Sequence, residues 1–183
     1  MDETELGNML LAHARNAIAE RFGRHGGATH RHAALDQPGA SFVTLTQQGD
    51  LRGCIGSLEA HRPLGLDVRE NALAAAFRDP RFAPLAVEEF EHTRVEVSLL
   101  TPAMAISFRD EADFLAQLRP GVDGIVFQYG RHRSTFLPQV WESLPEPQQF
   151  MQQLKRKAGL PPNFWHEAVS IARYEVTKWK EVR

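Results

Sequence analysis

Two strand-forming segments lie only four residues apart in the first third of the chain. They are SFVTLT at 41–46 and LRGCIGSL at 51–58, and the turn QQGD separates them. Parallel strands need a crossover of a dozen or more residues, so this spacing requires an antiparallel hairpin. A second hairpin is predicted further on, where GIVFQYG at 124–130 and STFLP at 134–138 flank a polar turn. Neighbouring strands are therefore expected to run antiparallel.

Helical and strand periodicities are interspersed along the rest of the chain. Apolar residues at helical spacing predict helices at 6–22, 66–78, 110–118 and 147–158. Alternation predicts strands at 92–102 and 168–178, and glycines, histidines and a proline predict a surface connection at 24–40. This order predicts an α+β fold, with a largely antiparallel sheet flanked by helices, over a doubly wound one.

Composition limits the class of protein. The chain has 183 residues, 43% hydrophobic and 24% charged, which is typical of one globular domain, or one with a small lobe. A single cysteine cannot form an internal disulfide or a multi-thiolate zinc site. The first ten residues carry three acids and no base, and no segment is apolar enough to cross a bilayer. We therefore expect a soluble protein of the cytoplasm.

The charge distribution is mildly uneven. Residues 131–183 hold nine lysines and arginines against five acids, within a chain of net charge -2. That excess is well below the density of a dedicated nucleic-acid binder, so we expect no specific nucleic-acid partner. Lys155, Arg156 and Lys157 are predicted to lie near a helix C-terminus, where cations favour the helix dipole.

The segment from Leu51 to Ser57 carries the most chemical information. Common phosphate-loop, dinucleotide, nucleophile-elbow and zinc-protease signatures are absent. Gly53 and Gly56 flank Cys54 and would let a ligand or another backbone approach the thiol. Arg52 could support a thiolate, which would make Cys54 a nucleophile. The alternative is a small buried hydrophobe on a strand.

Other charged residues could join such a site. Asp79 and Arg81 follow a predicted helix and could line an anion-holding cleft, or serve as a helix end with a local ion pair. Glu96 and Asp123 could form a carboxylate pair, although turn formation also explains Asp123.

A metal site is not predicted. His30 and His32 have H-x-H spacing, which would put two imidazoles on one strand face. They lie in the connection at 24–40, and no third ligand is implied.

Six motifs occur in an order that resembles one family. They are LRGCIGSL after SFVTL, then DPRF, VEVSLLTP, GVDGIVF, STFLPQV and LKRKAGLP. The chain resembles the AMMECR domain family, which includes bacterial AmmeMemoRadiSam system protein A, from about Leu6 to Trp179. The resemblance implies a compact α+β domain over residues 1–183, with a smaller lobe packed on a larger one. It implies Memo-like and radical-SAM partners, and it supplies no established reaction or cofactor.

The same resemblance carries the family's presumed site onto Arg52, Gly53, Cys54 and Gly56. Some relatives have His-Gly where this chain has Asp123-Gly124. If that histidine serves as a base in those relatives, Asp123 would do the work differently, or the site would be structural.

These observations lead to three alternative functions. The first is a Cys54-dependent enzyme acting on a small molecule, with Arg52 as electrostatic support and Glu96 or Asp123 positioning the substrate. The second is a non-catalytic adaptor, and the third, which we place last, is RNA binding. For the enzyme we expect one cleft between the lobes that holds Arg52, Cys54 and at least two of Asp79, Arg81, Glu96 and Asp123.

Overall fold

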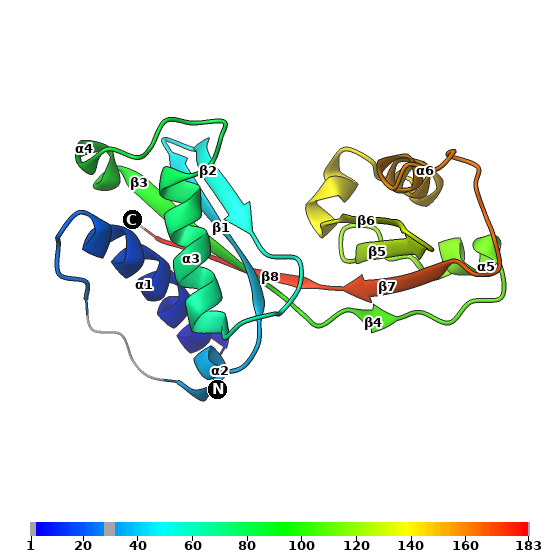
Figure 1. Cartoon of the computed structure of the whole chain (residues 1–183), viewed down its shortest axis with the longest axis horizontal. Coiled ribbons are helices and arrows are strands. Elements are labelled where there is room, and N and C mark those ends of the chain that lie inside the picture. The colour runs from blue at the N-terminus through cyan, green and yellow to red at the C-terminus, as the bar shows by residue number, and fades with distance from the viewer. Residues whose placement is uncertain (1–2, 28–31, 183) are drawn as a thin grey trace. The chain divides into compact units, whose positions relative to one another are not determined.

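The computed structural model describes residues 3–27 and 32–182 (Figure 1). The chain forms two compact units, one from residues 1–100 with 177–183 and the other from residues 101–176. Each unit contains a four-stranded sheet. Within the described ranges, no helix is long and apolar enough to cross a membrane.

The first unit places helices on an antiparallel sheet. Its strands, in sheet order, are β2 (Asp50–Gly56), β1 (Ala40–Gln47), β3 (Thr93–Leu100) and β8 (Val176–Lys180). Its helices are α1 (Glu3–Arg21), α2 (Ala33–Asp36), α3 (Leu64–Phe77) and α4 (Val87–Phe90). Helix α3 packs on β1 and β2, and α1 packs on α3 and β3.

The two faces of this sheet differ in chemistry because successive side chains point to opposite sides. Val43, Leu45, Val95 and Val97 are completely buried in the core with α1 and α3. The residues between them in sequence therefore face away from these helices. Thr44 is on that second face, paired with Cys54 on one side and Glu96 on the other.

The second unit has its own sheet and core. Its strands, in sheet order, are β4 (Met104–Ala105), β7 (Ser170–Tyr174), β5 (Gly124–Tyr129) and β6 (His132–Phe136). Its helices are α5 (Glu111–Gln117), the 3-10 helix η1 (Pro138–Glu142) and α6 (Pro147–Lys157). Phe114, Phe127 and Phe150 are fully buried, and Trp141 stacks on Phe150 with ring centroids 3.8 Å apart.

The α+β class and both predicted hairpins are confirmed. Two expectations of detail are wrong. The connection at 24–40 contains the short helix α2, and residues 28–31, with His30, lie outside the described residues. The predicted final strand at 168–178 is two strands, because Glu175 separates β7 in one sheet from β8 in the other. The backbone N–H and C=O of Glu175 are both paired with Thr101, which fixes the break.

Candidate functional site

Cys54 lies on the edge strand β2, and two charged side chains hold its backbone. Its N–H donates to Asp79 Oδ2 at 2.9 Å, and its carbonyl accepts from the Arg81 guanidinium at 3.3 Å. Arg81 also forms an ion pair with Asp79 at 2.7 Å, so the local ion pair expected for this segment is present. We call Asp79 and Arg81 the edge clamp, because together they occupy the hydrogen-bonding positions that a further strand would fill.

The edge clamp is strongly ionic. Asp79 is almost completely buried, and the hydrogen bond from Arg81, followed by backbone bonds from Cys54 and Arg81, holds the pKa of its carboxyl far below the usual range. The hydrogen bond to Asp79 raises the pKa of Arg81. The clamp therefore keeps an ionised pair, Asp79 with Arg81, bound to the backbone of the cysteine.

Cys54 is half-buried, and its thiol touches a hydroxyl. Thr44 Oγ1 donates to Cys54 Sγ at 3.3 Å. In the register of the sheet, Thr44 also pairs with Glu96 on β3. Cys54, Thr44 and Glu96 thus form one row across three strands, on the face away from α1 and α3.

The glycines around Cys54 are explained by close packing within the protein. A β-carbon on Gly53 would lie 2.1 Å from the carbonyl oxygen of Ala75, so helix α3 can approach β2 only because residue 53 has no side chain. A β-carbon on Gly56 would lie 2.2 Å from the ring of Phe42. The sequence allowed either a ligand or another part of the protein to approach these glycines. In the structure, protein atoms lie against both of them. A ligand role for them stays a prediction.

Arg52 points to a different partner from the one expected. The β1–β2 register shifts at Leu45, where Gly53 and Leu51 pair with successive residues of β1, so Arg52 is the extra residue of a bulge. Its guanidinium binds the Glu89 carboxylate through two bonds of 2.9 and 3.0 Å. The cation that contacts Cys54, at its backbone carbonyl, is Arg81.

The Arg52–Glu89 pair lines a hollow of about 490 Å³ at the end of the β1–β2 hairpin. Hydrogen bonds from Arg52, with others from the Ala86 amide and Gln47, lower the pKa of Glu89 to about 2. Arg52 also lies near the ring of Phe82, 5.8 Å from its centroid. Cys54 is not among the residues that line this hollow.

Asp123 belongs to the second unit and organises a turn there. It is completely buried, its carboxylate accepts from the Arg119 backbone amide and guanidinium, and Arg173 lies 3.8 Å away. Its carbonyl accepts from Trp141 Nε1. These contacts agree with the turn role considered from sequence. A cleft that also includes Asp123 stays a prediction, as do the catalytic roles of Arg52, Cys54 and Glu96.

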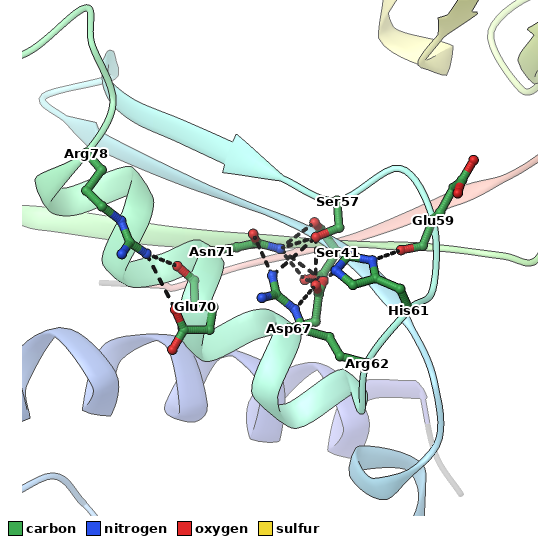
Figure 2. A network of polar contacts seen from close by, with 9 residues as sticks. All are labelled: Ser41, Ser57, Glu59, His61, Arg62, Asp67, Glu70, Asn71 and Arg78. Carbon is green, nitrogen blue, oxygen red and sulfur yellow. Dashed lines mark hydrogen bonds and ion pairs between the residues drawn. The ribbon is translucent and has the colours of Figure 1, made fainter. Parts of the chain in front are cut away.

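A buried polar network near the start of α3 was missed from sequence (Figure 2). Asp67 is completely buried, and its carboxylate accepts from five donor groups. The donors are the Ser41 amide and hydroxyl, Ser57 Oγ, Arg62 Nε and Asn71 Nδ2. The network ties β1 and the segment after β2 to α3.

One signal could have revealed this network. Asp67 and Asn71 are four residues apart and fall on the same helical stripe as the apolar Leu64, Val68 and Ala75. Two polar side chains on the buried stripe of an alanine-rich helix must find partners inside the protein.

The described residues contain no group of three or more His, Cys, Asp or Glu placed to hold a metal ion. His32 begins α2 and accepts a hydrogen bond from the Ala34 amide. His30 lies outside the described ranges.

Comparison with known proteins identifies the family. The sequence profile of the AMMECR1 family matches residues 11–179. Protein MJ0810 of Methanocaldococcus jannaschii is 40% identical over 149 residues, which cover 77% of this chain and 72% of that protein. Protein LS215_2104 of Saccharolobus islandicus is 36% identical, with 98% of this chain and 83% of that protein covered.

A solved structure has the same fold. The crystal structure of uncharacterized protein PH0010 from Pyrococcus horikoshii is similar, with a TM-score of 0.79 and 29% identity. The alignment covers 97% of this chain and 92% of PH0010. A profile match across nearly the whole chain, relatives above 30% identity and a similar solved structure agree, and the chain belongs to the AMMECR1 family.

Proposed function

We propose that the protein is a Cys54-dependent enzyme. The observation that carries the proposal is the convergence on Cys54 of groups from two other segments, β1 and the loop after α3. Thr44 donates to its sulfur, Asp79 accepts from its amide, and Arg81 donates to its carbonyl. Cys54 is also only half-buried, which agrees with the access that a nucleophile needs.

The contacts fit nucleophilic chemistry. A hydroxyl donor at the sulfur stabilises negative charge on the sulfur during attack. In the proposed step, the sulfur gives an electron pair to an electrophilic carbon of a small-molecule substrate and forms an S–C bond. The thiol proton goes to a carboxylate, and the leaving group departs with its bonding pair.

Glu96 is the candidate proton acceptor in this unit. It is half-buried, on the same sheet face as Cys54 and two strands away, about 10 Å between backbones. Direct transfer over that span is too long, so the Thr44 hydroxyl between them, or a water, would carry the proton. Glu96 is in none of the ion pairs of the described residues, which leaves its carboxylate available.

A second candidate is a non-catalytic adaptor. The observation that favours it is that packing alone accounts for Gly53 and Gly56, against Ala75 and Phe42. The LRGCIG segment would then be a structural device that seats α3 on the sheet.

Thiol alkylation distinguishes the two candidates. The rate of iodoacetamide labelling of the native protein is measured against that of the urea-unfolded chain, with Cys54→Ser as the blank. The enzyme proposal expects native labelling at least as fast as unfolded labelling, and about tenfold slower labelling for Thr44→Val, because the donor to sulfur is lost. Thr46→Val, on the same strand face, is the matched control. Native labelling far slower than that of the unfolded chain supports the adaptor.

We also propose that the protein works in the cytoplasm with Memo-like and radical-SAM proteins. What supports this is family membership, since a bacterial member of the family is named for that three-protein system. Mixing the purified proteins and measuring co-elution would test it, and separate elution at micromolar concentrations would count against it.

A further inference from the structure

Seven of the eight lysines and arginines of the second unit fall into two groups, and the eighth, Arg133, has an interaction of its own. Four of them form ion pairs: Arg109 with Asp113, Arg119 with Asp123 and Glu175, Arg173 with Asp123, and Lys155 with Glu111. Lys155 is almost completely buried, so the end of α6 has a structural cation as well as solvent-facing ones. The other group, Arg131, Arg156 and Lys157, is exposed and takes part in none of these pairs.

The exposed group comes from two segments that contact each other. Arg131 lies in the β5–β6 turn, and Arg156 and Lys157 lie in the last turn of α6. His132, next to Arg131, bonds through Nδ1 to the Ala158 carbonyl at 2.9 Å, which joins the hairpin end to the helix end. Lys157 in turn donates to the carbonyl of Thr135 on β6 at 2.9 Å.

Aromatic rings border the same hairpin end, and another lies at the far end of β6. Tyr129 pairs with His132 across the hairpin and lies 4.8 Å from the ring of Phe164 and 5.1 Å from that of His166. Tyr129 and Phe164 are half-buried, and His166 is exposed. The ammonium group of Lys157 lies 5.1 Å from the ring centre of Phe136. The surface therefore offers positive charge beside apolar area.

Local structure explains this charge only in part. Arg156 and Lys157 favour the C-terminal end of the α6 dipole. Arg131 lies outside the helix, and like charges that collect without a counter-charge repel one another. Residues 129–136 and 154–168 contain a single acid, Glu167, which is exposed. A positively charged surface of this kind is complementary to an acidic partner.

We propose that Arg131, Arg156 and Lys157, with the Tyr129 and Phe164 rings, form a docking surface for an acidic protein segment that also carries apolar side chains. We call it the hairpin surface. A protein partner fits better than a nucleic acid, because the surface is short and the whole chain has a net charge of -2. A long polyanion would extend past three cations onto a surface with no excess of positive charge.

The hairpin surface is independent of the proposed thiol chemistry. It lies wholly in the second unit, whereas Cys54, Thr44 and Glu96 lie in the first. Failure of one proposal therefore leaves the other standing.

The test uses the full chain and three fluorescein-labelled probes in an anisotropy titration. The probes are a peptide of four Glu-Glu-Phe repeats, a peptide of four Lys-Lys-Phe repeats and an oligomer of twelve uridines. At about 50 mM salt we expect the acidic peptide to bind, the basic peptide not to bind, and raised salt to weaken the affinity. The double variant Arg131→Glu with Arg156→Glu should weaken binding at least about tenfold.

The matched control is Arg109→Glu in the same unit, whose side chain is 87% exposed and pairs with the nearby Asp113. It should leave the affinity unchanged, and circular dichroism should show the same folded spectrum for all variants. The proposal is overturned if the acidic peptide does not bind, if the double variant binds it as well as the parent chain, or if the uridine oligomer binds more tightly than the peptide.

Discussion

The buried carboxylate of Asp67 gives the sharpest test of how the first unit is held together. Asp67→Asn keeps the shape of the side chain but removes its charge and turns one acceptor oxygen into a donor. If Oδ2 remains the acceptor for Ser41 and Asn71, the new amide faces two donors, Ser57 Oγ and Arg62 Nε. The Ser57 hydroxyl can rotate, whereas Arg62, 26% exposed, loses a charge-assisted bond of 2.7 Å.

The expected cost follows from these two contacts. A hydrogen bond to a charged group contributes about 1.5–3 kcal/mol, and breaking a buried pair on one side costs about 3–5 kcal/mol. Because Arg62 can reach water, we take the lower part of that range, about 3 kcal/mol. With a urea m-value of about 2 kcal/mol/M, the unfolding midpoint should fall by about 1.5 M.

The assay must report on each unit separately. Trp179 packs in the first core, while Trp141 and Trp165 pack in the second, so bulk fluorescence mixes the two. Hydrogen exchange read by mass spectrometry at rising urea gives a midpoint for peptides of each unit. The Asp67→Asn loss should appear in peptides from residues 40–100.

The control lies one turn away on the same helix. Glu70 pairs with Arg78 at 3.5 Å and both side chains are at least 40% exposed, so Glu70→Gln should cost less than about 0.5 kcal/mol (Figure 2). A midpoint for Asp67→Asn that matches that of Glu70→Gln would refute the idea that the network stabilises this unit.

Three further predictions address other contacts. Gly53→Ala should destabilise the first unit by about 1–3 kcal/mol in urea unfolding, because its β-carbon would lie 2.1 Å from the Ala75 carbonyl oxygen; an unchanged midpoint would mean that α3 does not approach β2 so closely. Asp123→Asn should cost about 2–3 kcal/mol in the second unit alone, since the side chain is fully buried against Arg119, and exchange protection lost equally in both units would contradict this. Acid should destabilise the first unit, because Asp79 and Glu89 have a lower pKa in the folded protein than in the unfolded chain. Their contribution to the free energy of unfolding is complete above about pH 4.5 and is lost as the pH falls toward 2. Urea midpoints that stay level from pH 5 to about pH 2.5 would show that these pairs contribute nothing.

Local pattern predicted most elements of the fold, and it failed where distant segments decide the outcome. The hairpin at 41–58 follows from strand-forming residues around a short turn, and the structure has it as β1 and β2. The alternation at 168–178 correctly predicted extended structure, but it could not show that the segment divides between two sheets, because alternation does not say to which sheet a residue belongs. Only the pairing of Glu175 with Thr101, 74 positions away, reveals the change of sheet.

The candidate site shows the same division. The LRGCIG segment pointed to Cys54 from sequence, and the ion pair of Asp79 with Arg81 was foreseeable because the two residues are neighbours. The partner of Arg52 was not, since Glu89 is 37 residues away on a helix too short to leave a periodic signal. Thr44 became visible as the contact of the thiol only through strand register.

The split of the last strand into β7 and β8 affects synthesis of the chain. The first unit takes its edge strand β8 from residues 176–180, after the whole second unit has been translated (Figure 1). At about 5–20 residues per second, β3 waits roughly 4–15 s for its neighbour once it has left the ribosome. During that interval the emerging chain has a strand edge open to pairing with other nascent chains. The ring of Trp179 on β8 lies against Gly7 of α1 in the folded protein, so this contact with the first core forms only after β8 has been made.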